Sequence, residues 1–444
     1  MKKISALCAL LIAFPMSLFA QGSDQPDTLI LSRIRKQGID NSQVMEILSM
    51  LTDVNGPRLT NSPGFKRAAE YARTKLQSWE VENVHFDYWD QVFGRGWELK
   101  RFSLSNTAPT WWPVIAYPRA WSPGVKGTIR ADAVYLDVEK ESDLAAYKGK
   151  LKGKIVLFSE PATVTPSYSP DATRLTDSTL QVMAEAKASP PYRRRYSPPT
   201  DEQKLEYLKW ELCQKEGAAA VVEVSSRLED DGTLEVSQAT VPYPPDVPYA
   251  KRIPAWSADA PKILPQIVVN AEHYNRMVRE LEKHVPVALE LVLETEFTPA
   301  ERGFNIIGEI PGTDLKDEVV MIGAHFDSWH SANGTTDNAA GSAVMLETMR
   351  ILKALGVHPR RTIRIALWGG EEEGLIGSRS YVMRTLGVSQ DDRYPYDSVQ
   401  LTAAGEKFSV YFNMDNGTGK YRGVYLQGNE NVMPVFREWL KPIA

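Results

Sequence analysis

The last third of the chain alternates between apolar runs and segments with helical periodicity. Runs rich in apolar residues at 319–323, 362–368 and 408–414 predict three strands. Between them, 342–355 and 374–383 repeat apolar residues every three or four positions, which predicts helices. Strands that alternate with helices favour a mostly parallel sheet with helices on both faces. We therefore predict an α/β fold for this part of the chain.

The first two thirds predict a more varied set of elements. Ser62 and Pro63 mark a helix start, with serine as the cap and proline in the first turn, and the helical spacing continues to Leu76. Further helices are predicted at 205–217 and 271–283. Short strands are predicted at 84–89, 133–136, 154–158, 218–224, 267–269 and 287–293.

Two stretches fit neither pattern. Residues 95–124 are rich in tryptophan and proline, and we expect an irregular connection there. Residues 161–201 contain seven prolines, which predicts a long excursion over the surface instead of core structure.

Residues 1–20 have the pattern of an export signal. Two lysines precede an apolar stretch at 4–14, and Ala20 offers a small residue for cleavage before Gln21. A membrane anchor is the alternative, but it needs about 20 apolar residues. We therefore predict an exported protein, periplasmic or secreted, without a membrane span once the signal is removed.

The overall composition is typical of a soluble globular protein, with 43% hydrophobic and 24% charged residues. The formal net charge of −5 is mild, and no basic stripe indicates a nucleic-acid partner. Only Cys213 remains after the signal, so an internal disulfide is excluded, and a buried thiol is favoured over a nucleophile. The oligomeric state is not indicated.

Acidic and imidazole side chains follow each of the three C-terminal strands. His325 and Asp327 follow the first strand, the acidic run 371–373 follows the second, and Asp415 follows the third. Asp337 lies in the loop that leads into the helix at 342. The carboxyl ends of such strands form the ligand-binding edge of an open α/β sheet, where clustered acids need cations to offset their charge. An acidic run can also be a solvated helix start, but the full set favours a metal site.

The donor types indicate zinc, with manganese and cobalt as alternatives. One carboxylate can bridge two ions held about 3.5–4 Å apart. Asp327, two residues after His325, can accept a hydrogen bond from the second imidazole nitrogen and so orient the ring.

In this order and spacing, the motifs resemble the co-catalytic di-zinc exopeptidases, the family of leucyl aminopeptidases and plasma glutamate carboxypeptidase (carboxypeptidase Q). The family pattern is His-x-Asp, an aspartate before a small-residue helix start, Glu-Glu, and a later aspartate. The resemblance implies that His325, Asp337 and Asp415 hold one Zn²⁺ ion. It implies that Asp337 also bridges to a second Zn²⁺ ion, which Glu372 holds.

The same resemblance assigns the catalytic residues. Glu371 would be the general base, because the family frame Glu-Glu-x-Gly closes here at Gly374. Asp327 would support it as the second catalytic residue. The peptide bond between Asp337 and Asn338 would be cis.

The resemblance also implies a domain layout. Residues 1–20 would be the signal peptide, 21–126 the N-terminal part of the peptidase domain, and 298–444 the catalytic core. Residues 127–297 would form an inserted, β-rich protease-associated domain that carries the excursion at 161–201.

One feature of the family pattern is missing. The family places a histidine ligand downstream of the last aspartate, whereas this sequence has no histidine beyond His358. We therefore expect that the catalytic core is truncated at its C-terminus; the alternative, a complete chain, would leave the second ion without its imidazole and weakly bound.

The activity implied is hydrolysis of a terminal bond in a peptide or dipeptide, with an aminopeptidase as the first expectation. A dipeptidase or carboxypeptidase of the same family is the alternative. A non-catalytic scaffold of the transferrin-receptor type is the rival from another class, and a single-zinc glutaminyl cyclase is a third option. Next to the site, His330 and Trp329 are expected at the surface, with substrate contact as the alternative.

Overall fold

The computed structural model describes residues 26–166, 168–170, 172–186, 198–226, 233–389, 399–417 and 419–443. The export signal predicted for 1–20 lies outside these residues. The chain divides into two units, and the larger one comprises 34–174 and 192–419. The smaller unit includes 175–191 and the C-terminal residues from Lys420, and it contains the helices α4 (Asp177–Glu185) and α10 (Met433–Leu440).

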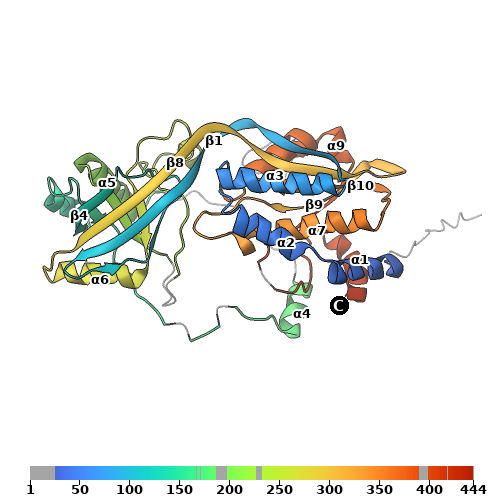
Figure 1. Ribbon diagram of the computed structural model, residues 1–444, viewed down its shortest axis with the longest axis horizontal. Coiled ribbons are helices and arrows are strands. Elements are labelled where there is room, and N and C mark those ends of the chain that lie inside the picture. Colours follow the sequence, from blue (N-terminus) through green and yellow to red (C-terminus); the bar gives the residue numbers. More distant parts are fainter. Residues whose placement is uncertain are drawn as a thin grey trace, which may run out of the picture. The chain divides into compact units, whose positions relative to one another are not determined.

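The larger unit is built on one mixed sheet with the strand order β13-β9-β10-β8-β4-β5-β6-β7-β3, and β1 pairs with β8 (Figure 1). The pairs β13–β9, β9–β10, β4–β5, β5–β6 and β6–β7 are parallel. The strands are β1 (Glu82–Ala108), β2 (Trp112–Pro113), β3 (Ala116–Pro118), β4 (Thr128–Tyr135), β5 (Ile155–Leu157), β6 (Ala220–Val224), β7 (Gln266–Val269), β8 (Ala288–Ile310), β9 (Leu315–His325), β10 (Arg361–Trp368) and β13 (Phe408–Asn413), with β11 (Gly387–Ser389) and β12 (Val399–Leu401) as a separate antiparallel pair. The predicted α/β class is confirmed.

Helices lie where the capping and periodicity signals predict them. Ser62 caps α3, its side chain accepting a hydrogen bond from the Phe65 amide, and Pro63 occupies the first turn. Gly217, with φ of +74°, ends α5 in the left-handed region that favours glycine. The helices of the larger unit are α1 (Thr28–Asp40, which begins in the smaller unit), α2 (Val44–Ser49), α3 (Pro63–Ser78), α5 (Asp201–Glu216), α6 (Ala271–Glu282), α7 (Ala340–Ala354), α8 (Ile376–Tyr381) and α9 (Ala403–Glu406).

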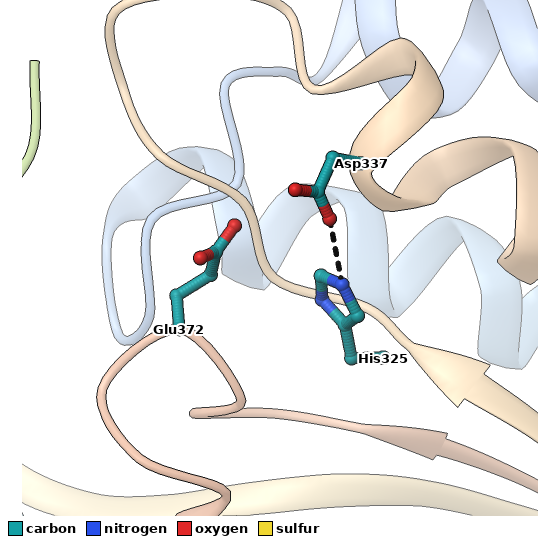
Figure 2. Close-up of side chains that lie close together, drawn as sticks. All are labelled: His325, Asp337 and Glu372. Carbon is teal, nitrogen blue, oxygen red and sulfur yellow. Dashed lines mark hydrogen bonds and ion pairs between the residues drawn. The ribbon is translucent and has the colours of Figure 1, made fainter. Parts of the chain in front are cut away.

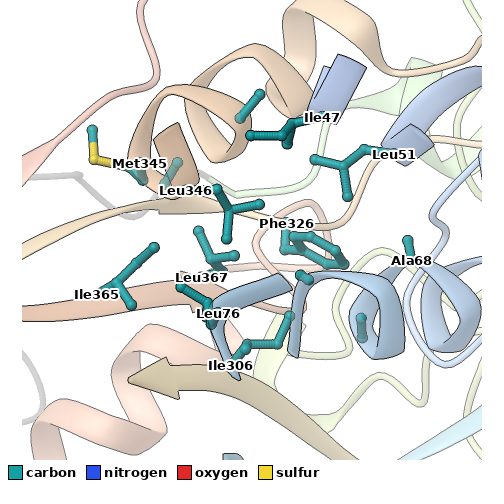
Figure 3. Packing of buried hydrophobic residues seen from close by; sticks show 14 of the residues in the cluster. Ile47, Leu51, Ala68, Leu76, Ile306, Phe326, Met345, Leu346, Ile365 and Leu367 are labelled. Atoms are coloured by element: carbon teal, nitrogen blue, oxygen red, sulfur yellow. The ribbon is translucent and has the colours of Figure 1, made fainter. Parts of the chain in front are cut away.

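The core around β8, β9 and β10 uses both faces of the sheet, because successive residues of a strand point to opposite sides. On one face, Ile306, Ile365 and Leu367 pack with Leu76 of α3 and Leu346 of α7 (Figure 3). The opposite face packs with α8, and its buried residues are Ile307, Met321, Ala366, Trp368 and Tyr381. Helices therefore cover both faces, as predicted.

The expectation of an irregular connection at 95–124 is wrong for most of that segment. Strand β1 continues to Ala108 and pairs with β8, with Trp97 opposite Phe297 and Leu104 opposite Leu291 (Figure 1). The partners lie about two hundred residues away in the sequence, so local composition did not indicate the pairing.

The excursion at 161–201 is a surface segment, as predicted. None of its described residues is buried, although it contains α4, which the proline content did not predict. Among the described residues, no helix has both the length and the apolar character needed to span a membrane. The domain boundaries at 126/127 and 297/298 stay predictions.

Candidate metal centre

Three parallel neighbours bring the predicted ligands to one edge of the sheet. His325 is the last residue of β9, Glu372 follows β10, and Asp415 follows β13. Because β13, β9 and β10 are adjacent and parallel, their carboxyl ends meet. Asp337 joins them from the segment η4 (Thr335–Ala339) that precedes α7, where its own backbone is not helical (φ −119°, ψ 94°).

The side chains of His325, Asp337 and Glu372 point toward one another (Figure 2), and one ligand atom of each lies within 4.8 Å of the other two. The Nε2 atom of His325 is 2.9 Å from Oδ1 of Asp337 and 3.4 Å from Oδ1 of Asp415. His325 is buried, whereas the Asp337 side chain is 68% exposed. The centre is therefore buried where His325 leaves the sheet and open to solvent at Asp337. This donor set fits a divalent cation.

Asn338 holds two of the ligand segments together. Its buried side-chain amide donates to the backbone oxygen of Met414 and to Oδ1 of Asp415, and its Oδ1 accepts from the Gly341 amide. A side chain at Gly341 would place its Cβ 2.4 Å from the Asn338 Oδ1, so this close approach requires glycine. The Asp337–Asn338 peptide bond is cis, as expected.

Asp327 contacts a different partner than predicted. The Nδ1 atom of His325 donates to the backbone oxygen of Asp327 at 3.1 Å, while the carboxylate oxygen is 3.6 Å away. This donation leaves Nε2 as the nitrogen that faces the other ligands. The fully buried Asp327 carboxylate instead accepts the backbone amides of Glu371 and Glu372, both at 3.2 Å.

The acidic turn after β10 is held through four consecutive backbone amides. Besides the two amides on Asp327, the Gly370 amide donates to the hydroxyl of Thr60 and the Gly369 amide to Oδ1 of Asn305, both at 3.2 Å. Gly370 has φ of +66°, and a Cβ there would lie 2.6 Å from the ring of Trp89. These contacts fix the backbone conformation of the turn, and with it the directions in which the side chains of Glu371 and Glu372 project.

Clustered carboxylates shift the protonation of the centre. Burial, with the charges of Asp337 and Asp327, raises the pKa of Glu372 to about 8. Burial also raises the pKa of Glu371. For His325, burial lowers the pKa, but the adjacent carboxylates outweigh burial and raise the pKa far above its usual range. A site that holds its acids partly protonated and its imidazole charged is one in which a cation can replace protons.

The model of Peptidase family M28 matches residues 305–443, a range that contains all four predicted ligands. This segment of the chain is therefore similar to peptidase family M28. Carboxypeptidase Q of Mus musculus is 24% identical over 394 residues, which cover 88% of this chain and 69% of that protein. Carboxypeptidase Q of Xenopus laevis is 31% identical over 338 residues, covering 76% of this chain and 60% of that protein.

A solved structure shares the fold. The crystal structure of a Peptidase M28 precursor from Shewanella amazonensis SB2B aligns with a TM-score of 0.57 at 20% identity, covering 94% of this chain and 80% of that one. The predicted resemblance to the zinc exopeptidases is confirmed. The family match and the peptidase relatives support a hydrolase that acts on peptide bonds.

Two residues of this site lie outside the matched range, and sequence reasoning did not assign them a role. Arg58 is fully buried, and its guanidinium donates to the backbone oxygens of Leu51, Phe326, Asn333 and Gly334. Burial lowers its pKa to about 10. Thr60 is also fully buried and contacts the acidic turn. Both lie in the motif Asn55-Gly56-Pro57-Arg58-Leu59-Thr60, which resembles the N-terminal part of the family and could have indicated them.

Among the residues that neighbour the predicted site in the sequence, His330 differs from expectation in its burial. His330 is buried, with 4% of its surface exposed, so the expected surface position is wrong. Its Nε2 donates to the backbone oxygen of Pro118 at 2.7 Å, and its ring contacts Trp97 and Tyr117. Cys213 is buried, and burial raises its thiol pKa to about 12, which agrees with a structural role.

Proposed function

We propose that this protein is a zinc-dependent exopeptidase that removes one terminal residue from a peptide or dipeptide, and that an aminopeptidase is the first choice. The observation that carries the proposal is the convergence of His325, Asp337 and Glu372 at the open edge of the sheet, with Glu371 beside them.

The ligand set supports two ions. His325 and Asp415 would hold one ion together with Asp337, because both aspartates approach the same imidazole nitrogen. Asp337 would share its carboxylate with the second ion, which Glu372 would hold, since the ligand atoms of these two residues lie within 4.8 Å of each other. Imidazole nitrogen with carboxylate oxygen is a donor set that suits zinc. Two bound zinc ions would supply Lewis-acid polarisation of a carbonyl and activation of water.

Glu371 would move the proton. Its raised pKa brings the carboxylate nearer to the pH at which a general base works best. It would accept a proton from the attacking water on a side-chain oxygen and later donate it to the nitrogen of the leaving amine. Asp327 would not touch substrate; it would hold the amides of Glu371 and Glu372.

The test is the variant Glu371→Gln, which keeps the shape of the side chain and removes the base. We expect kcat to fall about 10²–10⁴-fold while the zinc content, measured by mass spectrometry, stays equal to that of wild type. Glu139→Gln, at an exposed glutamate, is the matched control and should behave as wild type. Equal turnover of Glu371→Gln and wild type would refute the role, and an inactive, metal-free wild type would favour the non-catalytic scaffold.

One acid beside the centre favours recognition of a substrate amine. The carboxylates of Asp337, Asp415 and Glu372 would be neutralised by the bound ions, whereas Glu371 is assigned to no ion and would attract an ammonium. A carboxypeptidase is the second candidate, because the relatives named above are called carboxypeptidase Q. Hydrolysis of an aminoacyl p-nitroanilide but not of an N-acylated dipeptide would support the aminopeptidase, and the reverse result would support the carboxypeptidase.

We also propose that the chain is exported, because 1–20 have the pattern of a cleaved signal. Mass spectrometry of the protein recovered outside the cytoplasm should give an N-terminus at or within a few residues of Gln21. Recovery of the intact N-terminus in the cytoplasm would contradict the proposal.

A further inference from the structure

A short segment before α3 touches both halves of the site. The backbone amide and carbonyl of Arg58 pair with the side chain and the amide of Ser328 respectively, next to Asp327. Two residues later, the Thr60 hydroxyl reaches the acidic turn. This segment therefore joins the loop after β9 to the turn after β10, although it is hundreds of residues distant from both in the sequence.

The Thr60 hydroxyl uses both its donor and its acceptor in the site. It donates to Oδ2 of Asp327 at 3.2 Å and accepts the Gly370 amide at 3.2 Å. Asp327 in turn accepts the next two amides of the turn. The Thr60 hydroxyl and the Asp327 carboxylate thus accept three consecutive amides of the turn. The hydroxyl also donates to the carboxylate and so orients it.

Removing the hydroxyl would leave two buried groups unpaired, the Gly370 amide and one lone pair of Asp327. An unpaired buried polar group is costly, so the turn would shift to find another partner. Such a shift would act on Glu371 and Glu372, the next two residues, because the Asp327 oxygen that Thr60 contacts also accepts the Glu372 amide. A bound zinc ion would hold the Glu372 carboxylate in place, whereas Glu371 binds no ion in the proposed site and would be displaced. The ligands His325 and Asp337 belong to other elements and have no hydrogen bond to Thr60 among the contacts described.

We infer that Thr60 is a positioning residue for the acidic turn, and that its hydroxyl holds the proposed base Glu371 in the orientation needed for proton transfer. The inference rests on the proposed function of Glu371. If Thr60 had only a packing role, its methyl group would be sufficient, and removal of the hydroxyl would not change turnover.

The experiment compares Thr60→Val, which keeps the shape and removes the hydroxyl, with Thr60→Ser, which keeps the hydroxyl. For Thr60→Val we expect kcat to fall about 10- to 100-fold, because small displacements of a reacting group cost this much, with KM within about threefold of wild type and an unchanged zinc content. Thr60→Ser should recover kcat to within about threefold. The matched control is Thr362→Val, since the buried Thr362 hydroxyl also accepts an amide (Gly312) and donates to a carbonyl (Lys316), but at the opposite end of β10.

Each other outcome overturns the inference. Wild-type kcat in Thr60→Val, or equal losses in Thr60→Val and Thr60→Ser, would show that the hydroxyl does not position the base. A large loss of zinc, or unfolding of both Thr60→Val and Thr60→Ala at the assay temperature, would show a structural role. The proposed function fails separately: in that case Glu371→Gln keeps wild-type turnover, whatever Thr60→Val does.

Discussion

The buried imidazole of His330 makes a specific prediction about stability against pH. Its ring is enclosed by Trp97 and Tyr117, Nε2 donates to the backbone oxygen of Pro118, and Nδ1 has no hydrogen-bond partner among the described residues. Burial lowers the pKa of His330 to about 4, from an ordinary value of 6.5. The folded protein therefore keeps this ring neutral at a pH at which the unfolded chain protonates it.

The sign of the effect follows from proton linkage. Between the two pKa values the unfolded state binds one more proton, so stability rises with pH and is lost as pH falls below 6.5. The loss attributable to His330 is about 2 kcal/mol at pH 5 and about 3 kcal/mol at pH 4, because one pKa unit corresponds to about 1.4 kcal/mol. Above pH 7 the contribution vanishes.

The perturbation is His330→Gln, which keeps a donor toward Pro118 and cannot titrate. We expect the free energy of unfolding of the larger unit, measured by urea titration in chelator from pH 7.5 to 4.5, to fall more steeply in wild type than in the variant. At pH 5 the difference should change by about 2 kcal/mol relative to pH 7.5. His358→Gln, at an exposed histidine, is the control and should follow the wild-type slope.

Parallel curves for wild type and His330→Gln would refute the reasoning. They would mean that the ring reaches water, or that the folded state accepts the proton without cost. A steeper curve for the variant would give the wrong sign and refute it equally.

Two further predictions concern the metal centre and the core. Burial and neighbouring acids raise the pKa of Glu372 to about 8, and the carboxylates keep His325 protonated, so zinc binding at pH 7 should release protons from both groups. The zinc affinity should therefore increase with pH, less steeply above about pH 8, where Glu372 is already ionised. Calorimetry in buffers of different ionisation enthalpy measures the release, and no release would contradict the charge state described. The Leu346 side chain of α7 is fully buried, and Leu346→Ala should lower the free energy of unfolding by about 2–5 kcal/mol. Leu401→Ala, at an exposed leucine, is the control and should change it little. A loss below about 1 kcal/mol for Leu346→Ala would contradict the packing shown in Figure 3.

Local elements and the chemistry of the site could be predicted from the sequence. The start of α3 depends on a cap and a proline, and both lie within one turn of each other. The convergence of His325, Glu372 and Asp415 could be predicted because these three proposed ligands lie at the carboxyl ends of strands, and adjacent parallel strands bring those ends together. These inferences need only neighbours in the chain and one rule of topology.

Contacts between distant segments were decided only by the tertiary structure. Thr60 lies 267 residues from Asp327 and 310 from Gly370, and no local pattern indicates which amide a buried hydroxyl will meet. The length of β1, the enclosure of His330 and the partner of the Asp327 carboxylate have the same cause. Periodicity reports whether a side chain is buried, whereas its hydrogen-bond partner depends on how remote elements pack, and that packing is a property of the whole fold.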